Sequence, residues 1–434
     1  MTGMDSDADV ITAIHDPMPG YERLALIKNG NLTDILISDM SDHTPAFGSI
    51  FMARVTNSFP DHGRVQLNIG QMGVASMRVA KPSAFFSGAL IPVTVQAEPR
   101  EHKPAQMRHG MIRETRFAII HYVPDTSGQL HISKRLKEGL ADQPNSDLMD
   151  RMDTLNALAA AHHCQITLRQ SAQNHPIDIV MESINRQLDD MDDLVSVSKT
   201  VMHQGLLASA PSLTHVAERY VYPEQIMTDH DGRLWADADI DQHIDMALSP
   251  SLVLPEGGIL HLSTPPGAAV IDGDSGLSRL SPDALASDMI DPLVRQIRLR
   301  RISGAVVIDF PRLDQNGRER IHQSMVAACS DDPLRPNLYG WTKGGLYTLE
   351  RRHQMRPLPD VLDWHHAPAK YAAITGLRQL WQRSRNNSGS DKGLPPRLPL
   401  TTTAQDWLNH DGRPVRDAIC ADLPLPPEWI TVQP

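Results

Sequence analysis

The chain has 434 residues, of which 41% are hydrophobic and 21% charged, and its formal net charge at pH 7 is −11. This length allows several domains with a large core, and the absence of any run of about 18 apolar residues predicts no membrane span. The acidic balance argues against indiscriminate nucleic-acid binding, and three widely spaced cysteines predict neither a disulfide framework nor a zinc site, as expected for a cytoplasmic protein.

The first part of the chain predicts a tail, a hairpin and a small barrel. Residues 1–20 are acidic and lack the basic-then-apolar pattern of a targeting signal, so we expect a tail. Leu24–Ile37 predicts a β-hairpin, because Asn29-Gly30 tolerates the positive φ angles of a tight turn. From Phe47 onward, glycine turns about every ten residues separate short apolar runs, which is typical of a small β-barrel.

The next part of the chain is mainly helical. Leu148–Ala161 has Leu and Met at helical spacing among acidic residues, which predicts a surface helix. Ile177–His203 is also helical, and we interpret its aspartate cluster as a solvated face rather than a metal site. Cys164–Leu168 predicts a short strand leading into Arg169, which on sequence alone reads as a solvated surface group.

Two short apolar runs near the middle of the chain each end in an aspartate. Ala268–Ile271 is followed by Asp272, and Ala305–Ile308 is followed by Asp309. Both runs are bounded by glycine, which favours buried strands. A helix is expected between them, with an N-cap serine, a proline in its first turn and an apolar residue at every fourth position. These helix residues are Ser281, Pro282, Leu285, Met289, Leu293 and Ile297.

This strand–helix–strand order predicts a carboxylate site at one sheet edge. A crossover helix usually joins parallel strands, so Asp272 and Asp309 are expected at the same edge, about 4.8 Å apart if the strands are neighbours. Carboxylates that close repel unless a cation lies between them, and hard oxygen ligands suit Mg²⁺. Asp274 points to the same side as Asp272. The sequence also predicts that the arginine-rich helix end (Arg295, Arg298, Arg300, Arg301) lies beside this site. The alternative, that each aspartate merely caps a strand or turn, stays open.

Four stretches in collinear order resemble the bacterial ribonuclease E/G family. Gly48–Pro124 is similar to the S1 domain of that family, and the hairpin resembles the segment before it. The run PEGGILHLSTPPGAAVIDGDSG resembles the approach to the family's catalytic centre, and GAVVIDF resembles its second metal-binding strand. The resemblance covers roughly residues 20–355. The family often carries a CxxC zinc link between protomers, which this chain lacks, so no zinc-linked dimer is expected, and homo-oligomers of other kinds stay open.

The resemblance implies an α+β multidomain fold with an inserted S1 (OB-fold) barrel and a DNase I-like α/β catalytic subdomain. An RNase H-like subdomain would be split around the barrel and a 5′-sensor-like region. The implied boundaries are a tail at 1–20, the RNase H-like parts at 21–46 and 206–262, the barrel at 47–124, the sensor-like region at 125–205, the catalytic subdomain at 263–384, and a linker with a C-terminal tail at 385–434.

The resemblance also implies roles for residues in the catalytic centre. Asp272 and Asp309 match the two magnesium-binding aspartates. Asp274 falls where the family usually has an asparagine, so an extra carboxylate replaces an amide donor. Arg351 matches a family arginine near the active site, and we expect it, with the basic run after it, to contact RNA.

RNA-binding positions outside the centre are implied in the same way. Lys103 matches a basic RNA-contacting residue of the S1 domain, whereas Leu67 and Val74 fall where the family has aromatic residues that stack on bases. Arg169 matches the arginine of the 5′-monophosphate pocket, and Gln170 stands where a threonine is usual.

The resulting prediction is a cytoplasmic, magnesium-dependent endoribonuclease that cleaves single-stranded RNA in RNA processing or decay. Two alternatives stay open. The aliphatic S1 positions and the Asp274 change would also suit a catalytically weakened RNA-binding relative, and a scaffold that has lost nucleic-acid binding is the third reading.

Overall fold

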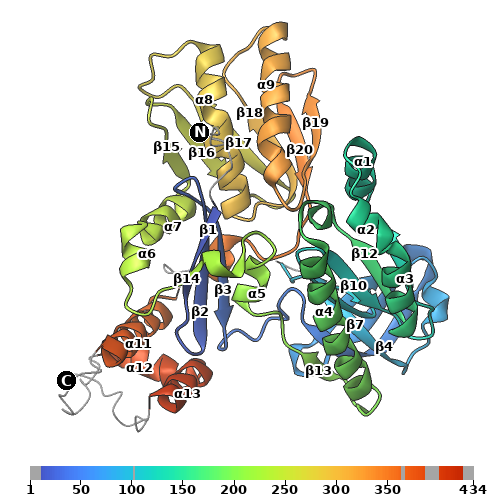
Figure 1. The fold of residues 1–434 in the computed structure, drawn as a ribbon. Helices are drawn as coiled ribbons and strands as arrows, with labels where there is room; N and C mark the ends of the chain where they lie inside the picture. The colour runs from blue at the N-terminus through green and yellow to red at the C-terminus, as the bar shows by residue number, and fades with distance from the viewer. Residues whose placement is uncertain (1–10, 101–102, 363–366, 387–399, 424–434) are drawn as a thin grey trace, which may run out of the picture. The chain divides into compact units, whose positions relative to one another are not determined.

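The computed structural model describes residues 11–100, 103–362, 367–386 and 400–423. The chain divides into two compact units, one formed by Met1–Asp42 with Glu224–Pro434, here called unit 1, and one formed by His43–Pro223, here called unit 2. Figure 1 labels the elements of both units. Within the described ranges, no helix is both long enough and apolar enough to cross a membrane.

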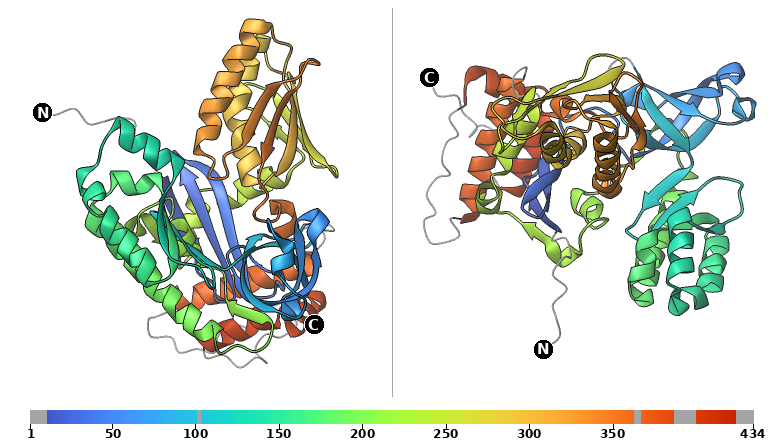
Figure 2. Two further views of the ribbon diagram at one scale, coloured as in Figure 1. Left: turned by 90° about the vertical axis from the view of Figure 1, so that its right-hand side faces the viewer. Right: turned by 90° about the horizontal axis from the view of Figure 1, so that it is seen from above.

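Unit 2 begins with a closed five-stranded barrel, as predicted. The strand order is β13-β4-β5-β6-β8-β7, and an additional β4–β7 pairing closes the ring, which is visible in Figure 2. Side chains alternate between a dry interior and an outer face, as the period of a strand requires. The five barrel strands are β4 (Ile50–Phe59), β5 (Arg64–Asn68), β6 (Val74–Arg78), β7 (Leu90–Ala97) and β8 (Ala105–His109), and β13 (Gly205–Ala208) pairs with β4 outside the closed ring.

The second part of unit 2 is a four-stranded sheet of order β11-β12-β10-β9 with helices packed on it. Its strands are β9 (Met111–Glu114), β10 (Ala118–Tyr122), β11 (Gln129–Ile132) and β12 (Cys164–Leu168), and its helices are α1 (Lys134–Asp142), α2 (Ser146–Asp150), α3 (Met152–Ala161) and α4 (Ile177–Ser198), with α5 (Leu213–Ala217) following. The predicted barrel boundary at residue 124 is therefore wrong. Because β9 and β10 pair with β12, the barrel strands before β13 end at His109.

Unit 1 contains a small sheet of order β14-β1-β2-β3. Its strands are β1 (Ile11–Asp16), β2 (Tyr21–Lys28), β3 (Asn31–Asp39) and β14 (Ile226–Thr228), and α6 (Arg233–Asp237) and α7 (Ile240–Leu248) follow. The hairpin prediction is confirmed, because Asn29 and Gly30 both adopt positive φ. The predicted tail is wrong from residue 11 onward, since β1 pairs with both β2 and β14. Residues 1–10 lie outside the described residues.

The C-terminal segment of unit 1 is a helical cluster. Its helices are α10 (Leu358–Val361), α11 (Pro368–Asn386), α12 (Thr402–Asn409) and α13 (Arg413–Asp422). The last three share a core with Met18 and Tyr21, and a Cβ on Gly20 would come within 2.8 Å of the Val415 backbone. The prediction of a linker and tail at 385–434 is thus wrong for the helical part. Residues 387–399 and 424–434 lie outside the described residues.

The largest element of unit 1 is a six-stranded sheet of order β15-β16-β17-β18-β20-β19. Its elements are β15 (Ser251–Val253), β16 (Ile259–Ser263), β17 (Ala268–Asp274), α8 (Pro282–Leu299), β18 (Gly304–Asp309), α9 (Gln315–Ala328), β19 (Asn337–Trp341) and β20 (Tyr347–Arg351). Both helices pack on one face (Figure 2), which leaves the opposite face, here called the open face, uncovered by them. The predicted boundary at 262/263 cuts through this sheet, because β15 and β16 belong to it.

Candidate functional site

The two predicted aspartates lie side by side on neighbouring parallel strands. β17 and β18 pair in parallel, and Asp272 is the register partner of Asp309 at the last paired position. Both side chains are exposed, whereas the preceding residues Ile271 and Ile308 are buried against the helices. The crossover prediction is confirmed in topology, register and face. Adjacent parallel strands bring such a pair to about 4.8 Å between backbones.

Local sequence explains how this edge is built. Helix α8 begins with Pro282, and the Ser281 hydroxyl accepts a hydrogen bond from the backbone N–H of Ala284, as predicted for its N-cap. Gly273 faces inward between the two aspartates of β17. A Cβ there would lie 2.8 Å from Met289 Sδ and 3.2 Å from the Asp309 carbonyl oxygen, so glycine lets strand and helix pack closely.

Neither carboxylate has a cationic partner within the described part of the chain. Among the residues that the structure describes, the side chains of Asp272 and Asp309 make no hydrogen bond and no ion pair, and no group of three or more His, Cys, Asp or Glu side chains forms a metal-binding cluster. Two neighbouring, unpaired carboxylates repel each other, and a divalent cation removes this repulsion. Mg²⁺ commonly uses one or two carboxylates and fills its other positions with water and phosphate oxygens, so this pair is compatible with it.

Asp274 closes the turn after β17. It lies on the same face as Asp272, and its Oδ1 accepts a hydrogen bond of 2.7 Å from the Gly276 backbone N–H. One carboxylate oxygen therefore holds the turn. The predicted same-side orientation is confirmed, while a role of Asp274 in catalysis stays a prediction.

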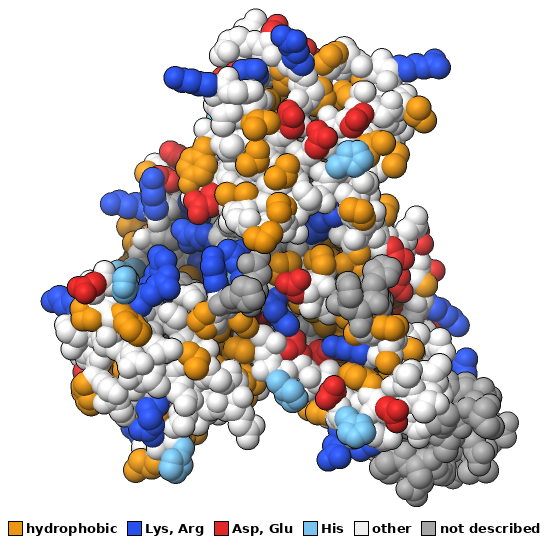
Figure 3. Space-filling view, turned by 180° about the vertical axis from the view of Figure 1, so that it is seen from behind, with side chains coloured by type: hydrophobic (Ala, Val, Ile, Leu, Met, Phe, Trp, Pro, Cys, Tyr) orange, Lys and Arg blue, Asp and Glu red, His pale blue; other side chains and the backbone are white. Residues whose placement is uncertain are grey.

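A histidine that the sequence analysis missed is the next residue in the same row. On the antiparallel strand β16, exposed His261 is the register partner of Asp272, and Ser251 on β15 is the partner of His261. The Ser251 hydroxyl lies 2.8 Å from His261 Nδ1, which fixes the orientation of the ring. Figure 3 shows acidic side chains and a histidine gathered on this face. The alternation in Ile259–Ser263 could have placed His261 outward, but only strand pairing reveals that it lies beside Asp272.

Basic side chains also occur at the edge that carries the aspartates. Arg279 lies in the β17–α8 loop, Arg312 in the β18–α9 loop and Lys343 in the β19–β20 loop, which meets this edge because Ile308 pairs with Tyr347. All three are exposed, and within the described part of the chain none of them forms an ion pair. These loops provide cations next to the paired carboxylates.

The predicted arginine-rich helix end lies at the opposite edge, which corrects the sequence expectation. A crossover helix runs antiparallel to its strands, so the C-terminus of α8 returns to the start of β18, five residues before Asp309. Its arginines hold the hairpin instead. Arg298 pairs with Asp34 at 2.5 Å, and Arg301 donates to the Ile35 carbonyl at 2.6 Å. Arg300 donates to the Ser249 carbonyl, and burial lowers its pKa to about 10.

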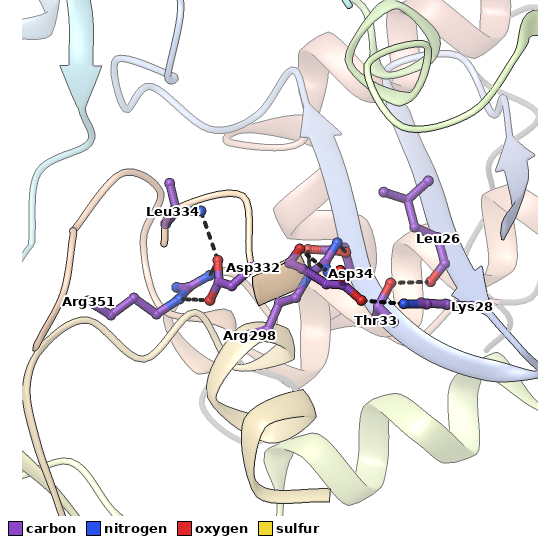
Figure 4. A network of polar contacts seen from close by, with 9 residues as sticks. Leu26, Lys28, Thr33, Asp34, Arg298, Asp332, Leu334 and Arg351 are labelled. Carbon is purple, nitrogen blue, oxygen red and sulfur yellow. Dashed lines mark hydrogen bonds and ion pairs between the residues drawn. The ribbon is translucent and has the colours of Figure 1, made fainter. Parts of the chain in front are cut away.

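Arg351 is also far from the aspartates, contrary to prediction. It pairs with Gly304 at the beginning of β18 and is only 5% exposed. Its guanidinium binds Asp332 through two hydrogen bonds, of 2.6 and 3.2 Å, and donates a third to the Ile302 carbonyl. Figure 4 shows Arg351 turned to Asp332 and Arg298 turned to Asp34. With its donors occupied inside the protein, Arg351 has no free face for RNA.

Arg169 and Gln170 lie at the end of β12 in unit 2. Arg169 forms an ion pair with Glu114 and donates to the Thr115 carbonyl at 3.0 Å, while Gln170 is exposed. Arg219 binds the same Glu114 carboxylate at 3.0 Å. Burial raises the pKa of Glu114, but the two guanidinium groups outweigh burial and lower the pKa overall. The guanidinium of Arg169, which the resemblance assigns to phosphate binding, is therefore already bound by a carboxylate of this protein.

The barrel residues that the resemblance singles out fall on different faces. Leu67 is fully buried in the barrel core, so it cannot stack on RNA, and the outward residue beside it is Gln66. Val74 is 52% exposed. Lys103 is exposed just before β8, which runs beside the first half of β6. Neighbouring residues of a strand point to opposite faces, so a base that stacks on this strand would meet Gln66 and not Leu67.

The stretch that carries the two aspartates matches a known protein family. A family model described as the ribonuclease E/G family matches residues 221–354, which include Asp272 and Asp309. Ribonuclease E from Synechocystis sp. is 22% identical, with 79% of this chain and 57% of the relative covered. Ribonuclease E from Nostoc sp. is 21% identical, with 71% and 51% covered. Ribonuclease G from Escherichia coli (strain K12) is 27% identical, with 29% and 27% covered.

A closed barrel and a mixed sheet that carries a pair of neighbouring carboxylates define this chain as an α+β protein with a candidate metal-binding edge. Residues 221–354 match the ribonuclease E/G family model, and the ribonuclease E relatives extend this similarity over most of the chain at modest identity. The chain spans about half the length of the two ribonuclease E relatives.

Proposed function

We propose that this protein is a magnesium-dependent endoribonuclease that cleaves single-stranded RNA during RNA processing or decay in the cytoplasm. The observation that carries the proposal is the Asp272–Asp309 pair, two adjacent exposed carboxylates without a cationic partner among the described residues. The names of the relatives, ribonuclease E and ribonuclease G, support the choice of RNA as substrate.

The residues of the open face suggest a division of roles. Asp272 and Asp309 would hold Mg²⁺, which when bound stabilises charge on a phosphate and lowers the pKa of a water molecule. His261 lies one strand from Asp272, and its Nε2 can donate to a phosphate oxygen when the Ser251 hydroxyl donates to Nδ1. Arg279, Arg312 and Lys343 would attract the RNA backbone toward this edge through their positive charge.

The sensor region has a narrower proposed role. Arg169 and Gln170 remain the proposed contacts for a 5′-monophosphate, by resemblance. Because Glu114 already binds Arg169, a phosphate there competes with an ionised carboxylate, and the gain from exchanging one anion for another is small.

The test is cleavage of a 5′-monophosphorylated, A/U-rich oligonucleotide in Mg²⁺ by the wild type and by Asp309→Asn. We expect the variant to lose at least about a hundredfold in rate, because even outer-shell partners of a metal cost 10–100-fold. Mg²⁺ should raise the melting temperature of the wild type but not that of the variant. Glu350→Gln is the matched control, because Glu350 lies on the same open face but is held by Tyr339 at 2.7 Å.

Each result separates the three readings. RNA binding without cleavage in the wild type would favour the catalytically weakened relative, and neither binding nor cleavage would favour a scaffold. Equal loss in Asp309→Asn and Glu350→Gln would show that the whole face, not the aspartate pair, determines activity.

A further inference from the structure

The outer face of the barrel carries a row of three exposed side chains across strands β4, β5 and β6. Phe59 is the register partner of Arg64, and Arg64 is the register partner of Arg78. All three are exposed, and they alternate with the buried core residues Val65 and Met77. The row therefore presents one aromatic ring and two guanidinium groups on the same surface.

The arginine pair is unfavourable without a ligand. Like charges directly opposite each other on antiparallel strands repel and destabilise the sheet. Among the described residues, the side chains of Arg64 and Arg78 form no hydrogen bond and no ion pair, and Asp61, in the turn between β4 and β5, does not neutralise them. An anion placed between the two guanidinium groups would remove this repulsion, and phosphate suits the geometry of the guanidinium donors.

Exposed aromatic rings lie at the same end of β4. Phe59 is 43% exposed and Phe86 is 73% exposed, and no other phenylalanine among the described residues is as open. The segment that carries Phe86 runs along β4, because Ser58 Oγ donates to the Pro82 carbonyl at 2.7 Å and Ser87 Oγ donates to the Thr56 carbonyl at 2.9 Å. Aromatic rings beside a basic groove are the usual platform on which single-stranded bases stack.

The neighbouring row is polar rather than apolar, which favours nucleic acid over an apolar protein segment. Asn57, Gln66 and Ser76 are register partners, and Asn57 Nδ2 donates to Gln66 Oε1 at 2.8 Å. Beyond it, β6 continues to Val74, four residues or about 13 Å from Arg78. Lys103 lies at that far end, since Ala75 pairs with Ala105.

We infer that Phe59, Arg64 and Arg78 form a binding site for single-stranded RNA on this barrel, with a phosphate between the two guanidinium groups and a base on Phe59. The site lies at the end of β5 and β6 opposite Lys103 and takes over the stacking that buried Leu67 and aliphatic Val74 cannot provide. It rests on the proposed function for the choice of RNA, but not on cleavage.

The experiment measures binding of a short fluorescein-labelled oligoadenylate to the full chain in EDTA, so that cleavage does not interfere. Arg64→Glu should weaken binding at low salt at least about tenfold and reduce the salt dependence (log K against log [salt]) by about 0.7, the value for the one phosphate contact that is lost. The new glutamate faces Arg78, so the repulsive pair becomes attractive and the melting temperature should not fall.

Phe59→Ala separates stacking from charge. We expect binding to weaken about tenfold with an unchanged salt dependence, because a stacking contact carries no charge. Phe59→Trp should restore binding, since the indole offers a larger aromatic face. Arg186→Glu on α4 is the matched control, with the same charge change at an exposed arginine outside the barrel.

The inference is overturned if Arg186→Glu weakens binding as much as Arg64→Glu, because net charge rather than the row would then act. It is equally overturned if Phe59→Ala binds like wild type, if duplex RNA or polyglutamate competes as well as oligoadenylate, or if the wild type does not bind. Failure of the nuclease proposal has a different signature, namely tight binding that depends on this row without cleavage in Mg²⁺.

Discussion

Strand register decides which single residues meet at the candidate centre. The sequence was sufficient for Asp272 and Asp309, because two glycine-bounded apolar runs separated by a helix predict neighbouring parallel strands. It was not sufficient for His261, since the β16–β17 pairing is a long-range fact, nor for Leu67, where the position was matched one residue away from outward-facing Gln66. Alternating hydrophobicity predicts which residues of a strand face outward. Only the correct pairing register shows which residues of neighbouring strands lie side by side.

His261 is the residue whose role the register predicts most directly. We expect His261→Ala to lower kcat for RNA cleavage by about ten- to a hundredfold with little change in KM, because a donor aimed at developing phosphate charge acts mainly in the transition state. His261→Gln should recover part of the loss, since its amide N–H can replace Nε2. Steady-state kinetics in saturating Mg²⁺ provides the measurement.

Ser251→Ala and Ser263→Ala complete this comparison. Ser251→Ala removes only the hydrogen bond that orients the ring, so a several-fold loss of kcat is expected. Ser263 is exposed on the same strand and face as His261 but faces Val270 instead of Asp272, so its variant should behave like wild type. A His261→Ala enzyme with unchanged kcat would remove histidine from the proposed centre.

Helix direction and long-range ion pairs decide what the basic elements do. Both α8 and β20 carry arginines that were expected near the aspartates, those of α8 from the helix pattern and Arg351 from the family resemblance, yet both groups lie at the edge away from the aspartates. The first error follows from the geometry of a crossover, whose helix returns to the start of the next strand. The second could not be avoided, because nothing local marks Asp332 as the partner of Arg351.

Arg351 should therefore matter for stability rather than for RNA. We expect Arg351→Met to lower the free energy of unfolding by about 3–5 kcal/mol, because it leaves Asp332, which is 3% exposed, without its counter-ion. Denaturant unfolding measures this effect. Arg352→Met, at the exposed neighbouring position, should stay within about 0.5 kcal/mol of wild type.

The double variant Arg351→Met/Asp332→Leu tests the same interpretation from the other side. Removing both charges should recover much of the lost stability, since no buried charge remains unpaired. A role in RNA contact would instead appear as weaker oligonucleotide binding by Arg351→Met at full stability.

At the scale of the whole molecule, unit 2 is a continuous insertion into unit 1. The chain leaves unit 1 after Asp42 and returns at Glu224, and β14 then pairs with β1, so the two parts of unit 1 share a sheet. The sequence predicted such a split, with boundaries at 46 and 206 that differ from the observed ones. Composition does not mark the observed boundaries. The second one lies beyond residue 206 because β13 pairs with β4 and so belongs to unit 2.

This division predicts that His43–Pro223 folds when produced alone. The segment holds two complete cores, one inside the barrel and one between the second sheet and its helices, so it should give a cooperative thermal transition. It should bind the labelled oligoadenylate through the Phe59–Arg64–Arg78 row with an affinity within about threefold of that of the full chain, because no barrel contact is removed. A threefold difference is well below the 1.4 kcal/mol that corresponds to tenfold. It should not cleave RNA, since Asp272 and Asp309 lie in unit 1. Leu67→Ala in this segment should lower its free energy of unfolding by about 2–5 kcal/mol, as expected for a core leucine. A segment that aggregates or melts without cooperativity, while the full chain folds, would mean that the insertion depends on unit 1 for its stability.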